Sequence, residues 1–351
     1  KKPVGIYWLQ AIAVSLISDV ADRTIWVYRI PSFLGALLAV LMTFWGARRL
    51  FDQYTGLLAA ALLAGCVVLM AESTIAKTDA FLVGCVVTAQ MALAQIYNGA
   101  RGGAQTAHFT FPGPAALVFW IAMGLGILIK GPVILMVSGL TLITLIILDR
   151  DASWLRRIQL LPGLLILALI LLPWSSAIWQ LTDGAFFTKS IGGDLGSKVV
   201  SGQESHGAPP GYFTILSLVG FWPGSLFLIP ALWWAWSKRN ITGVRFCLAW
   251  LIPSWIVFEL IPTKLPHYTL PLFPALACLC AVFLTELTQK NSQAFMVLHS
   301  KITLIGLGLW SIIAVIFAGL VSLYPITLGL SPSPLLLIIS CLSLLFSALG
   351  V

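Results

Sequence analysis

The chain has 351 residues, of which 59% are hydrophobic and 9% are charged, and its mean hydropathy is +0.99. A soluble domain would carry about 25% charged residues, so this composition excludes a soluble enzyme or binding module. The net charge of +8 is spread over short gaps between apolar stretches, whereas a nucleic-acid-binding protein gathers its basic residues on one face.

Apolar stretches follow one another almost without a break, which predicts an all-α fold, a polytopic transmembrane helical bundle. Because a helix needs roughly 20 apolar residues to cross the hydrocarbon core, we expect about 11 spans within a single membrane domain over residues 1–351. The expected spans are 25–47, 54–72, 79–98, 115–129, 131–148, 158–178, 212–236, 244–261, 268–286, 302–323 and 333–351.

Three segments depart from this pattern. Residues 3–18 are apolar but too short to span, so we expect a helix that lies on the outer membrane surface. Lys130-Gly131-Pro132 separates two short spans; one long kinked helix is the alternative there, and it would invert the topology of everything that follows. The glycine-rich stretch 180–211 is predicted to be a long outer loop, of a length that is usually functional or disordered.

The basic residues predict the orientation of the chain. With Arg48-Arg49 inside and the spans alternating from there, eleven of the 20 Lys and Arg residues fall on that side, with only four of the 12 acidic residues. An excess of Lys and Arg marks cytoplasmic loops. We therefore expect Arg48-Arg49 and the gaps on the same side at the cytoplasmic face, and the alternate gaps at the outer face.

Polar residues gather at the outer ends of the spans. They are Lys1-Lys2, Glu72, Lys77-Thr78-Asp79, Lys130, Glu204-Ser205-His206, Lys264 and His267-Tyr268. Lysine ammonium groups bind phosphate as point charges, a carboxylate can act as a general base, and a divalent metal prefers carboxylate and imidazole ligands. These residues could supply parts of a site for a lipid-linked phosphate, although their spacing alone does not show that they converge.

Plainer roles remain open for the same residues. Asp79 could cap the helix that begins there, because a short side-chain oxygen satisfies free N–H groups. Lys264 could extend its ammonium group to the membrane surface, and Lys130 could anchor a short span or pair with an acid. His206 and His267 could be ordinary polar residues of a loop and of the membrane interface.

Six motifs, taken in order, resemble those of a known family. They are Lys2-Pro3-Val4-Gly5-Ile6-Tyr7-Trp8, Lys77-Thr78-Asp79-Ala80, Ile129-Lys130-Gly131-Pro132, Leu172-Pro173-Trp174, Ser205-His206 with Pro209-Pro210-Gly211-Tyr212-Phe213, and Lys264-Leu265-Pro266-His267-Tyr268-Thr269-Leu270-Pro271. With these motifs the chain resembles the bacterial relatives of protein O-mannosyltransferases, the group that includes the aminoarabinose transferase of lipid A. The resemblance covers nearly the whole chain.

The resemblance implies a glycosyltransferase with the GT-C fold, in the bacterial inner membrane, whose active site faces the periplasm. Such enzymes take a sugar from a polyprenyl-phosphate carrier and invert the anomeric centre. The acceptor would be lipid A, lipopolysaccharide or a protein, and the partners would be these molecules and membrane lipids, with no nucleic acid.

The resemblance and the polar clusters together assign roles to individual residues. Lys2, Lys264 and Lys130 would bind the donor phosphate, and Asp79 would be the catalytic carboxylate in this chain. Further site residues would be Glu72, His206, His267 and Tyr268. His206 is also a candidate ligand for a divalent metal, the one cofactor implied. Lys1 stands where metal-binding relatives have a glutamate, which counts against the metal.

The family's main catalytic acid belongs to an Asp-Glu motif ahead of the Lys-Pro element, so we expect it upstream of Lys1. The 351 residues alone are then expected to be inactive. A transporter or flippase for a lipid-linked solute is the alternative function, and a structural membrane subunit is a third. A transporter would place polar residues near mid-span and often use broken, repeated helices, whereas here these residues lie at span ends.

Overall fold

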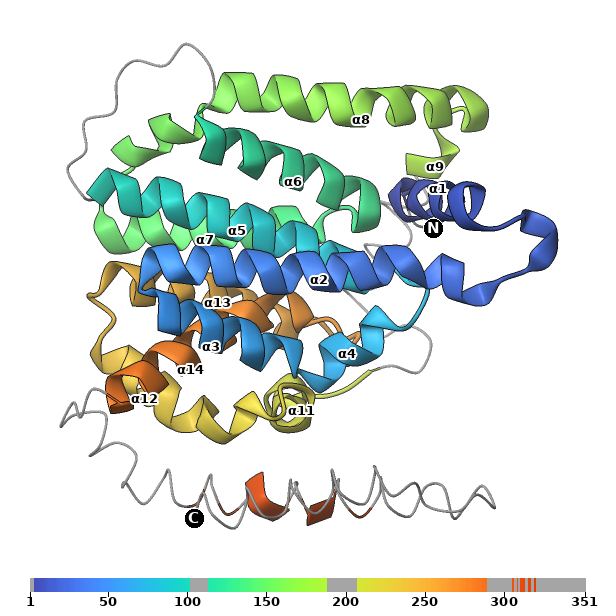
Figure 1. Ribbon diagram of the computed structural model, residues 1–351. Helices are drawn as coiled ribbons and strands as arrows, with labels where there is room; N and C mark the ends of the chain where they lie inside the picture. Colours follow the sequence, from blue (N-terminus) through green and yellow to red (C-terminus); the bar gives the residue numbers. More distant parts are fainter. Residues whose placement is uncertain are drawn as a thin grey trace.

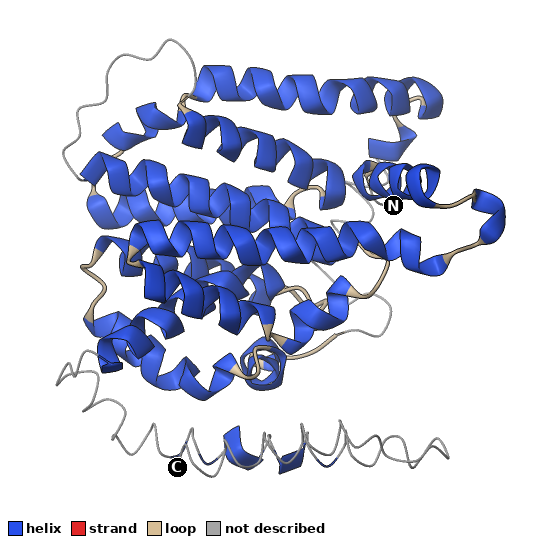
Figure 2. Cartoon of the chain, viewed as in Figure 1, coloured by secondary structure: helices blue, strands red, loops and turns tan. Residues whose placement is uncertain are grey.

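The computed structural model describes residues 3–101, 113–187 and 207–288, together with scattered positions between 305 and 319. These residues form helices joined by short turns, and they contain no strand (Figure 2). One isolated antiparallel bridge pairs Gly207 with Thr263.

Successive long helices run back and forth, so that the bundle has two ends (Figure 1). The α-helices of the described residues are α1 (Gly5–Ile17), α2 (Ile25–Leu50), α3 (Gln53–Ala64), α4 (Val67–Ser73), α5 (Asp79–Arg101), α6 (Pro114–Lys130), α7 (Val133–Asp149), α8 (Leu160–Thr182), α9 (Ala185–Phe187), α11 (Tyr212–Gly220), α12 (Leu228–Ser237), α13 (Thr242–Leu260) and α14 (Phe273–Thr288). Short 3-10 helices are η1 (Val20–Asp22), η2 (Ser153–Ile158), η4 (Gly224–Phe227) and η5 (Leu270–Leu272).

Among the described residues, five helices are long and apolar enough to cross a membrane, or six if the bent pair α3 and α4 is one span. The chain is therefore a helical membrane protein, but the larger number of spans expected from the sequence is not confirmed. The predicted spans 302–323 and 333–351 lie outside the described residues except for a few positions. The predicted span 212–236 is divided into α11, η4 and α12. The sequence predicted one span there because hydropathy does not register a break in the backbone.

The two short helices on either side of Gly131 form a hairpin. Helix α6 ends at Lys130, and α7 begins at Val133 and runs back in the opposite direction (Figure 1). Gly131 has a φ of 68°, which glycine adopts without the steric cost that a side chain would bring. The expected separation into two helices is confirmed, and the single kinked helix is excluded.

The bend between α3 and α4 is supported by neighbouring backbone. The two helices meet at 63°, so the first N–H groups of α4 have no partner in α3. The Val67 N–H donates to the Trp222 carbonyl at 3.3 Å, and the Cys66 thiol donates to the Gly220 carbonyl at 3.0 Å. Buried backbone groups need such partners, and the bend thereby sets the direction in which α4 carries Glu72.

Helix α5 lies at the centre of the bundle and α8 at its edge (Figure 1). In its most apolar stretch, 83% of α5 is buried, against 6% for α8. Helix α2 packs very closely on α5: a Cβ added at Gly35 would lie 2.3 Å from the Phe81 Cα. Small residues allow such close approach between membrane helices. Asp79, the first residue of α5, therefore lies in the middle of one end of the bundle.

Replacing Gly35 with alanine should destabilise the bundle. The added Cβ would clash with backbone atoms of Phe81, which cannot move aside as a flexible side chain can, so α2 and α5 must separate. We expect the free energy of unfolding to fall by about 1–3 kcal/mol, as measured by denaturant titration in detergent. Gly139→Ala is the matched control, because no atom lies within 4 Å of its added Cβ. Equal unfolding midpoints for the two variants would contradict the close approach.

Two predicted outer segments are described only in part. Helix α1 fills most of 3–18, and its place on the outer membrane surface stays a prediction. Of the predicted loop 180–211, the structure describes the end of α8, the short helix α9 and residues 207–211. The remainder, including His206, lies outside the described residues.

Candidate functional site

Four segments of the chain bring polar side chains to one end of the bundle. Glu72 lies in α4, Asp79 begins α5 and Lys130 ends α6. His267 and Tyr268 lie in the turn between α13 and η5. These segments meet because the helices alternate in direction (Figure 1).

The local sequence explains why the two charged residues sit where they do. Asp79 occupies the first turn of α5, where a carboxylate interacts favourably with the positive end of the helix dipole. Lys130 occupies the last turn of α6, where the negative end favours a cation. The turn before Asp79 is tied to α2, because the Ser32 hydroxyl donates to the Lys77 carbonyl at 3.0 Å. Two helix ends therefore hold the carboxylate and the ammonium group opposite each other.

The ammonium group of Lys130 forms an ion pair with Oδ1 of Asp79. The side chain of Lys130 is 21% exposed and that of Asp79 is 6% exposed. The Lys130 Nζ also lies 5.0 Å from the centre of the Tyr268 ring, a favourable cation–π geometry. An ammonium group has three N–H donors, and within the described part of the chain one of them is used in a hydrogen bond. Lys130 therefore keeps donors for a further anion.

His267 lies between two carboxylates. Its Nδ1 is 3.3 Å from Oε1 of Glu72, and its Nε2 is 3.5 Å from Oδ1 of Asp79. The imidazole ring stands edge-on to its neighbour Tyr268, with 5.3 Å between the ring centres. The ring thus links α4 to α5 and Lys130, and a displacement of His267 would affect both acids.

One carboxylate oxygen of the cluster has no hydrogen-bond partner among the described residues. Oε2 of Glu72 is buried and accepts no hydrogen bond from the described residues, although the Glu72 side chain is only 8% exposed. Such an orphaned acceptor needs an explanation, and a catalytic role or an ordered water or ion is the usual one. Glu72 therefore has acceptor capacity that a ligand or water can use.

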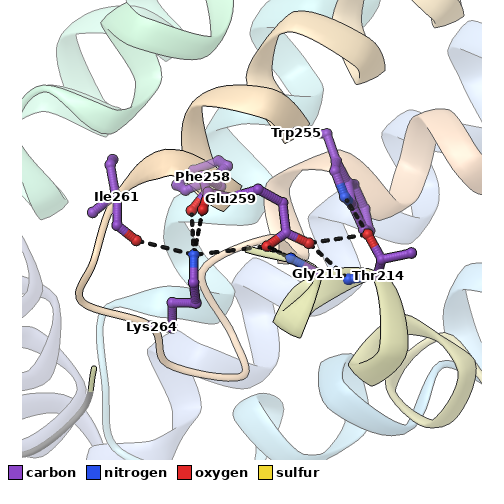
Figure 3. Close-up of polar contacts among 7 residues, drawn as sticks. All are labelled: Gly211, Thr214, Trp255, Phe258, Glu259, Ile261 and Lys264. Atoms are coloured by element: carbon purple, nitrogen blue, oxygen red, sulfur yellow. Dashed lines mark hydrogen bonds and ion pairs between the residues drawn. The ribbon is translucent and has the colours of Figure 1, made fainter. Parts of the chain in front are cut away.

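Lys264 has a different environment from Lys130. Its side chain is 1% exposed, and its Nζ donates to the carbonyls of Phe258, Glu259 and Ile261 at 3.4, 2.6 and 3.0 Å (Figure 3). Oε2 of Glu259 lies 3.7 Å away, and the Phe213 ring centre lies 5.2 Å away. Three carbonyls account for all three donors of the ammonium group.

The structure thus brings together Glu72, Asp79, Lys130, His267 and Tyr268, while the Lys264 ammonium group has a separate set of partners. Lys2 and His206 lie outside the described residues, so their roles stay predictions. The pairing of Lys130 with an acid was among the plainer roles open to it, and Asp79 is that acid.

Sequence reasoning did not single out Glu259, the acid that partners Lys264. Its signal was an ionisable residue inside the apolar stretch of α13. A charge in such a stretch is costly and is usually paired or functional. It lies five positions before Lys264, so the helix end and the turn after it can bring the two together.

The described residues do not fit a metal site. No group of three or more His, Cys, Asp and Glu side chains within 3–101, 113–187 and 207–288 could hold a metal ion. Glu72 and Asp79 contact opposite nitrogens of His267, so the three side chains do not point at a common centre. The predicted ligand His206 lies outside these ranges, and the metal remains a prediction.

A family model for dolichyl-phosphate-mannose-protein mannosyltransferases matches residues 1–179, just over half of the chain. The chain belongs to this family. The matched part of this family member includes Glu72, Asp79 and Lys130, while His267 and Lys264 lie beyond it.

Curated relatives of this mannosyltransferase-family member are bacterial proteins named undecaprenyl phosphate-alpha-4-amino-4-deoxy-L-arabinose arabinosyl transferase. The relative from Enterobacter sp. (strain 638) is 26% identical over 296 residues, which cover 82% of this chain and 50% of the relative. The relative from Sodalis glossinidius is 28% identical over 283 residues, covering 80% and 49%. The chain therefore spans about half the length of these relatives.

Solved structures confirm the fold expected for this family. ArnT from Cupriavidus metallidurans bound to undecaprenyl phosphate matches with a TM-score of 0.75 and 22% identity, over 92% of this chain and 55% of that one. The archaeal oligosaccharyltransferase AglB from Archaeoglobus fulgidus, in complex with an inhibitory peptide and a dolichol-phosphate, matches with a TM-score of 0.58 and 17% identity, over 98% and 48%. The predicted helical membrane fold is thus confirmed.

Proposed function

We propose that this chain belongs to a membrane glycosyltransferase that moves a sugar from a polyprenyl-phosphate carrier to an envelope acceptor. The acceptor is lipid A, lipopolysaccharide or a protein, and the reaction takes place at the periplasmic face of the bacterial inner membrane. The observation that carries this proposal is the partly exposed ammonium group of Lys130, held by Asp79 at the same end of the bundle as Glu72 and His267.

The charges of the reaction fit this arrangement. An acceptor hydroxyl attacks the anomeric carbon, the bond from that carbon to the phosphate oxygen breaks, and polyprenyl phosphate leaves with one more negative charge. A cation placed in advance at the departing phosphate stabilises this charge. Lys130 is the described lysine that suits this role, because its ammonium group is partly exposed and retains free donors.

The carboxylates have complementary roles in the proposal. Asp79 holds the Lys130 ammonium group and one nitrogen of His267. Glu72 holds the other nitrogen and keeps one oxygen available. The proton of the acceptor hydroxyl passes to a carboxylate general base. Tyr268 lies beside the Lys130 ammonium group and limits its movement.

The test is sugar transfer by the native protein in proteoliposomes. The names of the relatives suggest undecaprenyl-phosphate-linked 4-amino-4-deoxy-L-arabinose as the first donor and lipid A as the first acceptor. We expect modified lipid A and free undecaprenyl phosphate to form in equal amounts. Movement of the intact donor across the bilayer without release of undecaprenyl phosphate would instead identify a flippase.

A further inference from the structure

We propose that Lys264 and Glu259 are positioning residues, which act through His267. Their buried ion pair holds the turn 261–269 in place, and this turn carries His267 and Tyr268 to the acids. The inference rests on the proposed function and adds two residues to its machinery. It also gives Lys264 a different role from the phosphate contact expected from the sequence.

The ammonium group of Lys264 fastens the turn to the end of α13. The last carbonyls of a helix have no partner within it, and a lysine near a helix C-terminus can satisfy them. Lys264 reaches back to the carbonyls of Phe258, Glu259 and Ile261 (Figure 3). The chain therefore folds back directly after α13, and Lys264 stands three positions before His267.

The carboxylate of Glu259 fastens the same place to α11. Its Oε2 accepts from the Gly211 N–H at 2.9 Å, and its Oε1 accepts from the N–H and the hydroxyl of Thr214 at 2.9 and 3.0 Å (Figure 3). These groups form the start of α11, whose free N–H groups and positive dipole end favour a carboxylate. Gly211 has a φ of 97°, which a residue with a side chain rarely adopts.

The backbone ahead of α11 joins the same assembly. Gly207 pairs with Thr263, and the Ala208 N–H donates to the Pro262 carbonyl at 3.4 Å. The turn is therefore held on two sides, by the end of α13 and by the segment that leads into α11. The hydrogen bonds that form these attachments among the described residues end on groups other than Asp79 and Lys130, so the pair affects these two residues through the position of the turn.

The same contacts argue against a direct phosphate contact by Lys264. All three of its donors are used, its side chain is 1% exposed, and a phosphate would have to break several hydrogen bonds in a buried site. Lys130 has none of these constraints. The two lysines therefore have different roles in the proposal: Lys130 contacts the substrate, and Lys264 holds the turn.

Lys264→Met tests the proposal in the native protein. It removes the ammonium group but keeps an unbranched side chain. Misplacement of reacting groups by about 1 Å can lower a rate by about 10²-fold, and we expect a loss of that order in the transfer rate at saturating donor. If Lys264 acts through His267, the same substitution should cause little further loss in a His267→Ala background, because effects that share one path are not additive.

The control for this cycle is Asp149→Asn, which breaks an ion-pair network around a buried carboxylate and partly exposed arginines at the other end of the bundle. Its effect should be independent of His267→Ala. A full further loss on adding Lys264→Met to His267→Ala would overturn the proposal and favour direct phosphate binding. Wild-type transfer by Lys264→Met would overturn it as well. Should Lys264→Met not fold, Glu259→Gln, which keeps the shape and removes the charge, takes its place in the same cycle.

A second measurement does not depend on activity. Cysteines placed at Gly207 and Thr263 should form a disulfide when native membranes are treated with copper phenanthroline, read by peptide mass with and without reductant. The native cysteines of the described residues are buried. We expect most of this cross-link to be lost in the Lys264→Met and Glu259→Gln backgrounds. Retention of the cross-link in these variants would overturn the proposal. If the cross-link is lost in the variants but the native protein transfers no sugar, Lys264 and Glu259 still hold the turn, and only the proposed function is rejected.

Discussion

Asp79→Asn in the native protein should lower the rate of sugar transfer by about 10²-fold or more, the size of effect seen when one preorganised electrostatic group is removed. The substitution keeps the shape of the side chain but removes the negative charge that holds Lys130 and faces Nε2 of His267. The measurement is the initial rate of transfer at saturating donor. Asp22→Asn is the matched control: Asp22 is an exposed acid in the short helix η1, and its replacement should leave the rate unchanged.

Lys130→Met is a second variant that tests the same ion pair. If Asp79 acts mainly by holding the Lys130 ammonium group, the two single variants and the double variant should have similar rates, because the residues act as a unit. Lys238→Met, at the end of α12, is the matched control for the loss of a lysine. Normal transfer by Lys130→Met would show that this lysine does not stabilise the departing phosphate.

The helical membrane class could be predicted from the sequence, and so could the location of several polar residues at one end of the bundle, but not their mutual contacts. Hydropathy marks the spans, and alternation of spans places their outer ends together. This alternation depends only on the order of the spans. It therefore places Glu72, Asp79, Lys130 and His267 at one end, even though the bounds and breaks of single helices were predicted incorrectly. The hairpin at Gly131 kept the alternation in register.

The interruptions of the helices could not be predicted in the same way. The break between α3 and α4 depends on backbone partners such as Trp222, which lie far away in the sequence. The break within 212–236 is equally invisible to hydropathy, because the side chains on both sides of it remain apolar. Both features depend on tertiary contacts rather than on composition.

The partners of Lys264 could not be predicted from the sequence either. A lysine at the end of a span usually extends its ammonium group towards the membrane surface. Here the chain reverses after α13 and brings carbonyls and the Glu259 carboxylate within reach of Nζ (Figure 3). The choice between surface and interior depends on the path of a short turn, which neither periodicity nor motif spacing encodes.

Asp149→Asn should lower the free energy of unfolding by about 1.5–3 kcal/mol, because it weakens the charge-assisted hydrogen bonds that the buried carboxylate accepts from two partly exposed arginines and from Tyr97. Asp149 ends α7 with a side chain that is 4% exposed, and it pairs with Arg101 and with Arg245, the latter at 2.7 Å. Tyr97 donates its hydroxyl to the same carboxylate at 2.7 Å. One acid therefore joins α5, α7 and α13 at the end of the bundle opposite to Lys130.

The measurement is denaturant titration in detergent, with Asp151→Asn as the matched control. Asp151 is exposed and accepts hydrogen bonds only from the nearby Ser153 among the described residues, so its replacement should leave the unfolding midpoint unchanged. An equal midpoint for Asp149→Asn would mean that the network contributes little net stability. Transfer per folded molecule should survive in Asp149→Asn, because none of its partners touches Lys130 or His267. A loss of transfer as steep as that of Asp79→Asn would show instead that α5, which carries Asp79 at one end and the Asp149 partners Tyr97 and Arg101 at the other, transmits the change along the bundle.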